Sequence, residues 1–188
     1  MARTLLLIAA ALAIPASATP APDTISAMRD RGPAALDELL ARYDHMPAGA
    51  ERDTLAATID QVAAQRYATV SRLYWYTVEF GLIDTPRGLR TYGAGILSSG
   101  GEISYCLESA DPNRIGFDLL RIMQTGYKID TYQETYFVIR DFEQLFEATA
   151  PDFTPYYEQL RGREAYPPST VLATDRVYHR GLSPVRAA

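Results

Sequence analysis

Residues 73–83, LYWYTVEFGLI, are apolar or aromatic on almost every side, and the rest of the fold is predicted outward from them. A helix that is hydrophobic all round is buried, so we expect this segment to form a helix end inside the core. Glu79 is the one carboxylate in it. Because a bare buried charge is costly, Glu79 must pair with a cation, ligate a metal ion or have a raised pKa. These residues alone leave open a structural ion pair and a functional site.

Two glycine-containing stretches follow this segment. Residues 89–97, LRTYGAGIL, predict a strand or a pair of strands, interrupted by two glycines where another backbone comes close. Residues 98–101, SSGG, precede Glu102 and predict the capped start of a short helix. The hydroxyl of Ser98 and nearby backbone N–H groups could face an anion such as a carboxylate, but SSGG is also an ordinary turn sequence.

The remaining sequence predicts further short elements and an irregular end. Residues 117–123 and 142–149 predict amphipathic helices, the second of which ends before Pro151. Residues 127–139 alternate in polarity and are rich in β-branched and aromatic side chains, so we expect an extended segment. The proline-containing residues 161–188 show no periodicity and predict an irregular tail.

Upstream of residue 73 the sequence predicts two helices that pack as an antiparallel pair. Pro33 suits the first turn of the first helix. The apolar residues of that helix have helical spacing and are Leu36, Leu39, Leu40 and Tyr43. A break at residues 44–49 precedes a second, longer helix that starts near Glu51. Its apolar stripe consists of Leu55, Ile59, Val62, Val70 and Leu73. Nothing in these helices suggests chemistry.

The first 18 residues have the pattern of an export signal. Arg3 precedes an apolar run at residues 5–14, and residues 16–18, Ala-Ser-Ala, form a small-x-small cleavage site. The run is too short to span a membrane as a helix. We therefore expect export, to a periplasm, with a mature chain that begins near Thr19. The alternatives are an N-terminal helix buried in the fold and a cytoplasmic protein.

Composition narrows the classes of function. A chain of 188 residues suits one domain with a helical extension. A net charge of −5 without a cluster of Lys and Arg predicts no nucleic-acid binding. Cys106 is the single cysteine, so no internal disulfide can form, and we expect it to be a small buried apolar residue. The two histidines are His45 and His179.

Six blocks of sequence between residues 73 and 157 suggest a family. They are LYWYTVEFGLIDTP, GLRTYGAGILSS, YCLES, PNRIGFDLLRIM, YKIDTYQETYFVI and LFEATAPDF. Their order and spacing resemble the C-terminal part of the catalytic domain of bacterial phenylalanine 4-hydroxylases, which are tetrahydropterin-dependent aromatic amino acid hydroxylases. The resemblance implies a mostly helical α+β fold. It also implies a monooxygenase of phenylalanine catabolism that uses Fe(II), O2 and a tetrahydrobiopterin-type pterin to convert L-phenylalanine to tyrosine.

The resemblance also implies roles for single residues. Glu79 is similar to the carboxylate of a two-histidine, one-carboxylate iron site, which leaves open positions on Fe(II) for oxygen. Tyr74 is similar to the tyrosine near the iron, and Trp75 to a wall of the pocket for the amino acid ring. Gly95 and Ser98 are similar to positions that border the substrate carboxylate and the iron ligands. Two further matching positions have a less direct role, and they are Glu102 and Tyr127.

The sequence departs from the family where the other two iron ligands would lie. The family has an H-x-x-x-x-H segment upstream of the glutamate, but here His45 has Leu40 five residues before it. His179 lies in the tail, where we expect an exposed histidine. The pterin-binding loops and the arginine that would hold the substrate carboxylate also belong to the part that is not matched. Since one carboxylate cannot hold Fe(II) against water, we predict that this chain alone is inactive.

These observations together predict a chain of mixed origin. Residues 1–18 are a signal peptide, 19–72 a helical region unrelated to the hydroxylases, 73–160 a hydroxylase-like segment and 161–188 the tail. A natural fusion, an error of sequence assembly and an artificial joining all fit. The alternative function is a non-catalytic exported helical protein that carries a hydroxylase-derived segment. Apolar surface left by the unmatched part predicts self-association or a complementing chain.

Overall fold

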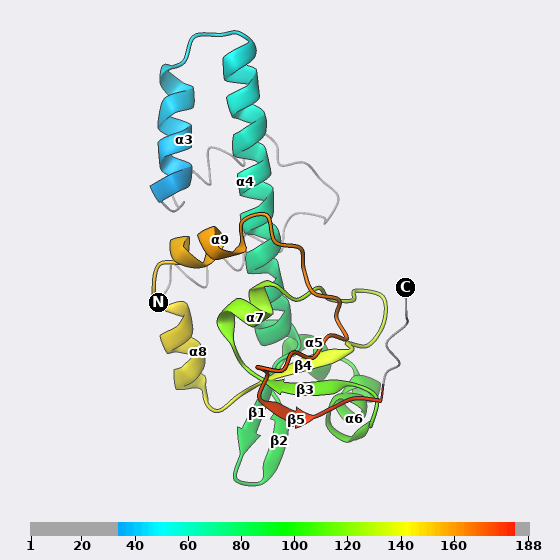
Figure 1. Cartoon of the computed structure of the whole chain (residues 1–188). Coiled ribbons are helices and arrows are strands. Elements are labelled where there is room, and N and C mark those ends of the chain that lie inside the picture. The colour runs from blue at the N-terminus through cyan, green and yellow to red at the C-terminus, as the bar shows by residue number, and fades with distance from the viewer. Residues whose placement is uncertain (1–33, 183–188) are drawn as a thin grey trace. The chain divides into compact units, whose positions relative to one another are not determined.

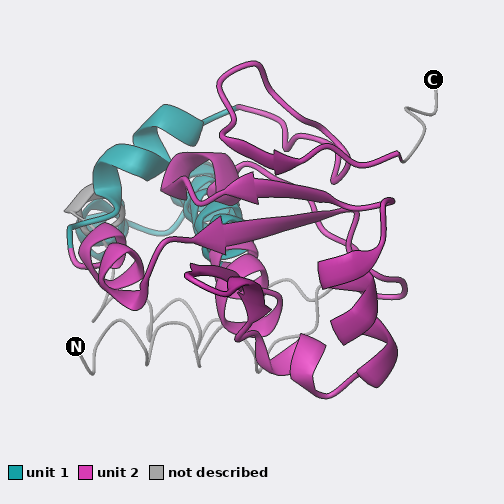
Figure 2. Ribbon diagram, turned by 90° about the horizontal axis from the view of Figure 1, so that it is seen from below, with its two compact units in different colours: residues 1–70, 151–162 teal, residues 71–150, 163–188 magenta. Residues whose placement is uncertain are grey.

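A computed structural model describes residues 34–182 of the chain, with side chains from Leu39 onward. The predicted export signal and the tether that follows it lie outside the described residues. The chain divides into two compact units (Figure 2). Of the described residues, unit 1 contains 34–70 and Pro151–Gly162, and unit 2 contains Ser71–Ala150 and 163–182. The chain therefore enters unit 2, returns to unit 1 and enters unit 2 again.

Unit 1 is helical. It contains α3 (Ala34–His45), most of α4 (Ala50–Tyr74) and α9 (Thr154–Leu160). In Figure 1, α3 and α4 run antiparallel, as predicted. They pack through a small apolar core whose buried members are Leu40, Leu55 and Ile59. The first part of the predicted stripe of α4, namely Leu55, Ile59 and Val62, therefore packs against α3, because burial of these side chains removes apolar surface from water.

Unit 2 is built on a five-stranded sheet with the order β2-β1-β4-β3-β5. The strands are β1 (Leu82–Thr85), β2 (Gly88–Thr91), β3 (Asn113–Gly116), β4 (Thr135–Ile139) and β5 (Val177–His179). The central strand β4 pairs in parallel with both β1 and β3. The two edge strands, β2 and β5, pair antiparallel with β1 and β3. All five residues of β4, TYFVI, are buried, as expected for a parallel strand covered on both faces.

Helices complete unit 2 and bury its core. They are η1 (Trp75–Glu79), α5 (Ala94–Leu97), α6 (Gly100–Glu108), α7 (Leu119–Met123) and α8 (Phe142–Thr149). The buried core cluster consists of Leu82, Ile96, Cys106, Tyr136 and Val138. Burial raises the pKa of the Cys106 thiol to about 12, and the expected buried cysteine is confirmed. The predicted α+β fold is also confirmed.

Local sequence signals account for several helix boundaries. The side chain of Ser99 accepts a hydrogen bond from the backbone N–H of Glu102, which caps α6 where a capped helix was predicted. Asp141 caps α8 in the same way, and α8 covers the predicted residues 142–149. Asp118 caps α7, so that helix begins two residues later than the predicted start at Phe117.

Three predicted elements were wrong in part. The helix predicted over residues 73–83 ends at Glu79, and its last residues form β1, because hydrogen bonds to β2 and β4 compete successfully with the helix. The extended segment 89–97 stops at Thr91, and residues 94–97 are the helix α5. Of residues 127–139, only 135–139 form a strand.

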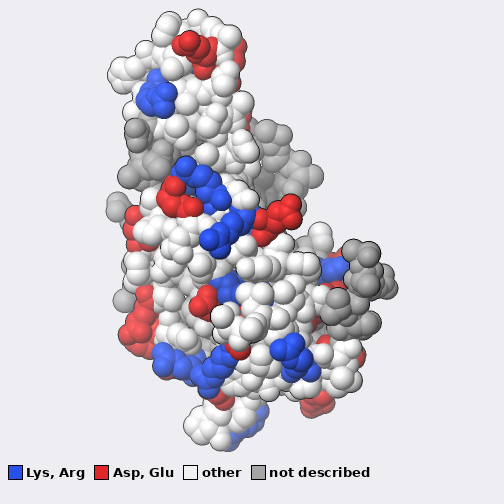
Figure 3. All heavy atoms as spheres, in the orientation of Figure 1, with Lys and Arg blue, Asp and Glu red and all other residues white. Residues whose placement is uncertain are grey.

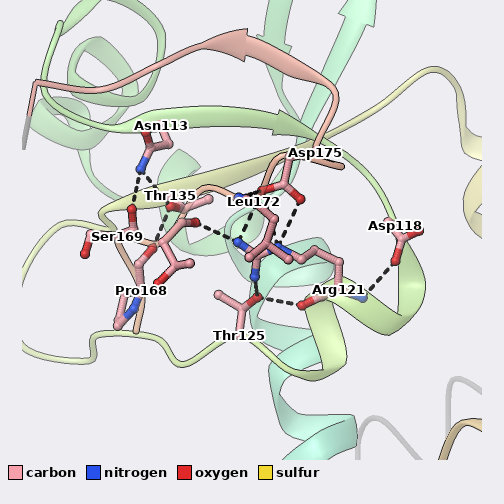
Figure 4. A network of polar contacts seen from close by, with 10 residues as sticks. Asn113, Asp118, Arg121, Thr125, Thr135, Pro168, Ser169, Leu172 and Asp175 are labelled. Atoms are coloured by element: carbon pink, nitrogen blue, oxygen red, sulfur yellow. Dashed lines mark hydrogen bonds and ion pairs between the residues drawn. The ribbon is translucent and has the colours of Figure 1, made fainter. Parts of the chain in front are cut away.

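The tail is irregular over most of its described residues, as predicted, but residues 177–179 form a strand that the prediction missed. β5 pairs with β3. Asp175 forms an ion pair with Arg121 of α7 at 3.1 Å, and both side chains are 5% exposed. Asn113 at the start of β3 donates to the carbonyl oxygen of Ser169 at 3.1 Å (Figure 4). Contacts between residues far apart in the sequence therefore hold a segment that has no periodicity of its own.

The surface is mixed in charge. On the face drawn in Figure 3, Lys and Arg side chains are interspersed with Asp and Glu. Within residues 34–182, no helix combines the length and the apolar character that a membrane crossing requires.

Candidate functional site

Glu79 lies at the end of a backbone irregularity. It is the last residue of η1, a π-helix that continues α4. The backbone N–H of Phe80 donates to the carbonyl oxygen of Trp75 at 2.8 Å, five residues earlier, which is the π-helical hydrogen bond. Short π-helical turns within α-helices are rare and occur frequently at functional sites. This geometry, which is independent of any family resemblance, favours a functional role for this turn.

Within residues 34–182, the carboxylate of Glu79 is held at one oxygen and has no ion-pair partner. The phenol of Tyr74 donates a hydrogen bond to its Oε1 atom at 2.7 Å. Its Oε2 atom faces Gly95, where an added Cβ would lie 3.1 Å away. Across the described residues 34–182, no Lys, Arg or His forms an ion pair with Glu79, which is half-buried. Of the alternatives considered above, the structural ion pair is therefore not the one seen.

Tyr74 acts as a hydrogen-bond donor to this carboxylate. Loss of water around its hydroxyl, together with the hydrogen bond to Glu79, raises the pKa of Tyr74 to about 12. The phenol therefore stays protonated at neutral pH and keeps its hydrogen on Oε1 of Glu79. This contact fixes the direction of the carboxylate and leaves Oε2 as the oxygen that can accept a further partner.

An aromatic wall stands beside the carboxylate. The ring of Trp75 stacks on Tyr127 at 4.5 Å between centroids, with 20° between the planes. It also lies 4.8 Å from the ring of Phe80. Sequence reasoning did not single out Phe80, although its place directly after Glu79 was a usable signal. Phe80 also limits the space at Gly95, because a Cβ there would lie 2.9 Å from the Phe80 ring.

The short helix α5 brings Gly95 against Glu79 and carries Ser98 at its end. The hydroxyl of Ser98 donates to the carbonyl oxygen of Gly95 at 2.8 Å, and the residue is exposed. In this arrangement the Ser98 hydroxyl is hydrogen-bonded to the backbone of α5. Glu102 makes its contacts with other residues than Glu79. It is 6% exposed and accepts a hydrogen bond from the hydroxyl of Tyr136 at 2.7 Å. Tyr74, Trp75, Glu79 and Gly95 are thus the predicted site residues that the structure brings together.

The two histidines lie on other elements. A ring nitrogen of His45 on α3 is 2.8 Å from the carbonyl oxygen of Ala41. A ring nitrogen of His179 on β5 is 3.1 Å from the carbonyl oxygen of Ala110, and this residue is half-buried in a strand rather than exposed in an irregular tail. In the part of the chain that the structure describes, no three His, Cys, Asp or Glu side chains gather as a metal site. The donors present there do not fit a complete two-histidine, one-carboxylate iron centre.

The chain is similar to known hydroxylases. The sequence model of a family described as biopterin-dependent aromatic amino acid hydroxylase matches residues 17–159. The phenylalanine-4-hydroxylase of Chromobacterium violaceum is 62% identical over 112 residues, which are 60% of this chain and 38% of the relative. The Homo sapiens phenylalanine-4-hydroxylase is 33% identical over 102 residues, or 48% of this chain and 22% of the relative.

A solved structure shows the same partial match. The iron- and phenylalanine-bound crystal structure of the C. violaceum enzyme has a TM-score of 0.60 and 55% sequence identity. The match covers 67% of this chain and 48% of that chain. The chain therefore spans less than half the length of the relatives it matches.

Proposed function

Because the chain belongs to the family of biopterin-dependent aromatic amino acid hydroxylases, we propose that residues 73–160 keep the carboxylate-bearing wall of a phenylalanine 4-monooxygenase site. We further propose that the 188-residue chain does not hydroxylate phenylalanine by itself. Family members act with iron and a biopterin cofactor, and the related crystal structure holds iron and phenylalanine. Binding of these groups by this chain is part of what must be tested.

The geometry around Glu79 is the observation that carries the proposal. A half-buried carboxylate with one oxygen held by Tyr74, and with no cation paired to it among the described residues, has the capacity to ligate a metal ion. The rings of Trp75, Tyr127 and Phe80 form an aromatic cluster on and against the turn that carries Glu79, and such a cluster is suited to line one side of a pocket for an aromatic ring. The chain thus presents one ligand and one side of a ring pocket. No step of the reaction is assigned to it, because the donor set is incomplete.

The first test is metal content followed by turnover. The purified chain is loaded with Fe(II) without oxygen, desalted and analysed for iron, and tyrosine formation is then measured with phenylalanine and a tetrahydropterin. We expect less than one tightly held iron per chain and no tyrosine. A matched control is Glu108→Ala on α6, which removes an exposed carboxylate. Turnover that persists in Glu108→Ala and is lost in Glu79→Ala would refute the proposed inactivity.

The second candidate function is a non-catalytic exported helical protein that carries a hydroxylase-derived segment. The separate core of unit 1, formed by Leu40, Leu55 and Ile59, favours it. Export to the periplasm belongs to this proposal, and it requires a mature N-terminus near Thr19. Cell fractionation followed by N-terminal sequencing tests it, and an intact Met1 in the cytosol would reject it.

A separate origin of residues 19–72 also stays a prediction. The family match extends over residues 17–159, whereas the alignment to the C. violaceum enzyme spans 112 residues. Sequencing of the locus across the codons for residues 66–78 tests this prediction. An uninterrupted, expressed reading frame there would rule out an error of sequence assembly.

A further inference from the structure

Tyr127 lies on an irregular segment, yet its ring takes a defined position. It stacks on Trp75 at 4.5 Å between ring centroids, with 20° between the planes. Trp75 is the first residue of the η1 turn, which ends at Glu79. Residues 126–134 belong to no helix or strand, and residues 129–132 are exposed. Contacts other than a regular backbone ladder must therefore determine where Tyr127 lies.

Buried side chains hold the backbone on both sides of Tyr127. The hydroxyl of Tyr76, a fully buried residue of η1, donates to the carbonyl oxygen of Gly126. On the other side, the carboxamide of Gln133 accepts a hydrogen bond from the backbone N–H of Lys128 at 3.2 Å. It also donates one to the carbonyl oxygen of the same residue at 2.7 Å, and Gln133 is 1% exposed. One amide side chain thus satisfies both backbone polar groups of the residue that follows Tyr127.

Two further contacts of this segment involve solvent-accessible side chains. The Nζ atom of Lys128 is 3.9 Å from Oε1 of Glu134, and an exposed ion pair of this kind contributes little. The ring of Tyr132, which is 43% exposed, lies 4.9 Å from that of Tyr105. Tyr132 is five residues away from Tyr127 along the chain. The bond from the N–H of Lys128 to the buried carboxamide, in contrast, acts on the peptide group that Tyr127 itself forms.

We propose that Gln133 is a positioning residue, which holds Tyr127 against Trp75 and so fixes the aromatic cluster on the turn that carries Glu79. The inference rests on the proposed function, because the position of this cluster matters for a ring pocket only if the turn belongs to such a site. A chain of contacts carries the effect. The carboxamide of Gln133 fixes the backbone at Lys128, that backbone fixes the ring of Tyr127, and that ring packs on Trp75.

The indole nitrogen of Trp75 offers a way to observe this effect. It is buried and, among residues 34–182, has no hydrogen-bond partner. A buried donor without a partner costs free energy, so it binds water when the rings around it move apart. Trp75 is the single tryptophan of the chain, and its emission and near-UV circular dichroism therefore report on the aromatic cluster directly.

The test compares Gln133→Met with the unsubstituted 188-residue chain, at urea concentrations below those that unfold either protein. Methionine keeps the length of the buried side chain and removes both hydrogen bonds to Lys128. We expect acrylamide quenching of Trp75 to increase about twofold, because the segment opens locally and admits solvent to the indole. Its emission should shift to longer wavelength. The tryptophan bands in near-UV circular dichroism should approach those of Tyr127→Leu, which removes the stacked ring.

Gln144→Met is the matched control. The carboxamide of Gln144 also bonds to the backbone of unit 2, since it accepts from the N–H of Arg140 at 2.8 Å, but it lies on α8. Lys128→Ala is a second control, which removes the exposed ion pair and keeps both backbone groups. We expect unchanged Trp75 spectra in both. If Gln133→Met does not fold, Gln133→Asn replaces it with the same expected result, because its amide is one methylene too short to reach Lys128.

A double variant, Tyr127→Leu with Gln133→Met, tests whether Gln133 acts through Tyr127. Its quenching should equal that of Tyr127→Leu alone, because the two changes interrupt the same chain of contacts. Unchanged Trp75 spectra in the Gln133 variant, an equal change in Gln144→Met or Lys128→Ala, or additive effects in the double variant would each overturn the positioning role. The proposed function fails on different evidence, namely stoichiometric iron and turnover by the chain alone.

Discussion

Arg121 and Glu79 are both charged residues in apolar surroundings of unit 2. Within the described residues, only Arg121 has an ion-pair partner. Arg121 is 6% exposed and pairs with Asp175 at 3.1 Å. It also donates to the hydroxyl of Thr125 (Figure 4) and to the carbonyl oxygen of Thr170. Glu79 is half-buried, and the phenol of Tyr74 is its hydrogen-bond donor within residues 34–182.

The difference separates a charge that serves the fold from one that is available for function. A buried guanidinium with its donors satisfied is costly to disturb, because removal of its partner leaves an uncompensated charge. A carboxylate with a free oxygen beside an aromatic wall is available to bind something else, and such groups cluster at functional sites. The following substitutions test this contrast, from the largest expected loss of stability to the smallest.

Asp175→Asn should cause the largest loss. It removes the charge that compensates Arg121, and we expect the free energy of unfolding of unit 2 to fall by about 3–5 kcal/mol. Trp75 is the single tryptophan and lies in unit 2, so its fluorescence during urea unfolding measures this unit. The solvent-accessible pair of Lys128 with Glu134 in the same unit is the control, and Glu134→Gln should change stability by less than about 1 kcal/mol. Equal effects of the two substitutions would remove the contrast.

Tyr136→Phe should come second. Its phenol donates to the buried carboxylate of Glu102 at 2.7 Å, and we expect a loss of about 1.5–3 kcal/mol, as for hydrogen bonds to charged groups. Tyr132→Phe removes the same atom from a residue that is 43% exposed, and should cost less than about 0.5 kcal/mol. Urea unfolding followed through Trp75 measures both. A loss below that of the control would show that Glu102 is satisfied by other means.

Gly95→Ala should lower the free energy of unfolding by an intermediate amount and displace the carboxylate of Glu79. The added Cβ would lie 2.9 Å from the Phe80 ring and 3.1 Å from Oε2 of Glu79, so these groups must shift, at about 1–3 kcal/mol. Gly100→Ala is matched to it, because Gly100 also lies in a helix but has nothing within 4 Å of an added Cβ. That control should be neutral or stabilising by up to about 1 kcal/mol. Thermal unfolding of the two variants side by side distinguishes close packing from helix propensity.

Glu79→Gln should have the smallest effect on folding. The amide oxygen can still accept the hydrogen bond from Tyr74, and no cation loses a partner within the described residues. We expect a change of within about 1 kcal/mol in either direction, as at sites where function rather than stability determines the residue. A loss as large as that of Asp175→Asn in urea unfolding would show that Glu79 is a structural charge after all.

Local sequence patterns predicted the elements that depend on local interactions. The period of Phe142, Leu145 and Phe146 and the proline that follows predicted α8. The serine run before Glu102 predicted the cap of α6. The helix pair of unit 1 followed from apolar spacing. Each of these rests on residues within a few positions of one another, which is the range that helix geometry makes adjacent.

Elements held by distant partners could not be predicted in this way. The tail forms β5 because β3 offers it an edge, and Asp175 lies 54 positions from Arg121. The site was predicted in part. The sequence singled out Glu79, but not the position of Phe80 against Gly95 or the use of the Ser98 hydroxyl by the backbone.

The sequence by itself determined that one carboxylate would lie in an apolar helix end, and that the residues around it follow the pattern of an aromatic amino acid hydroxylase. Only the tertiary structure decided what that carboxylate contacts. The π-helical turn, the Tyr74 hydrogen bond and the approach of α5 together leave Oε2 open. The physical reason is that composition and spacing determine which charges enter a core, whereas partners brought together by the fold determine which charges are satisfied there.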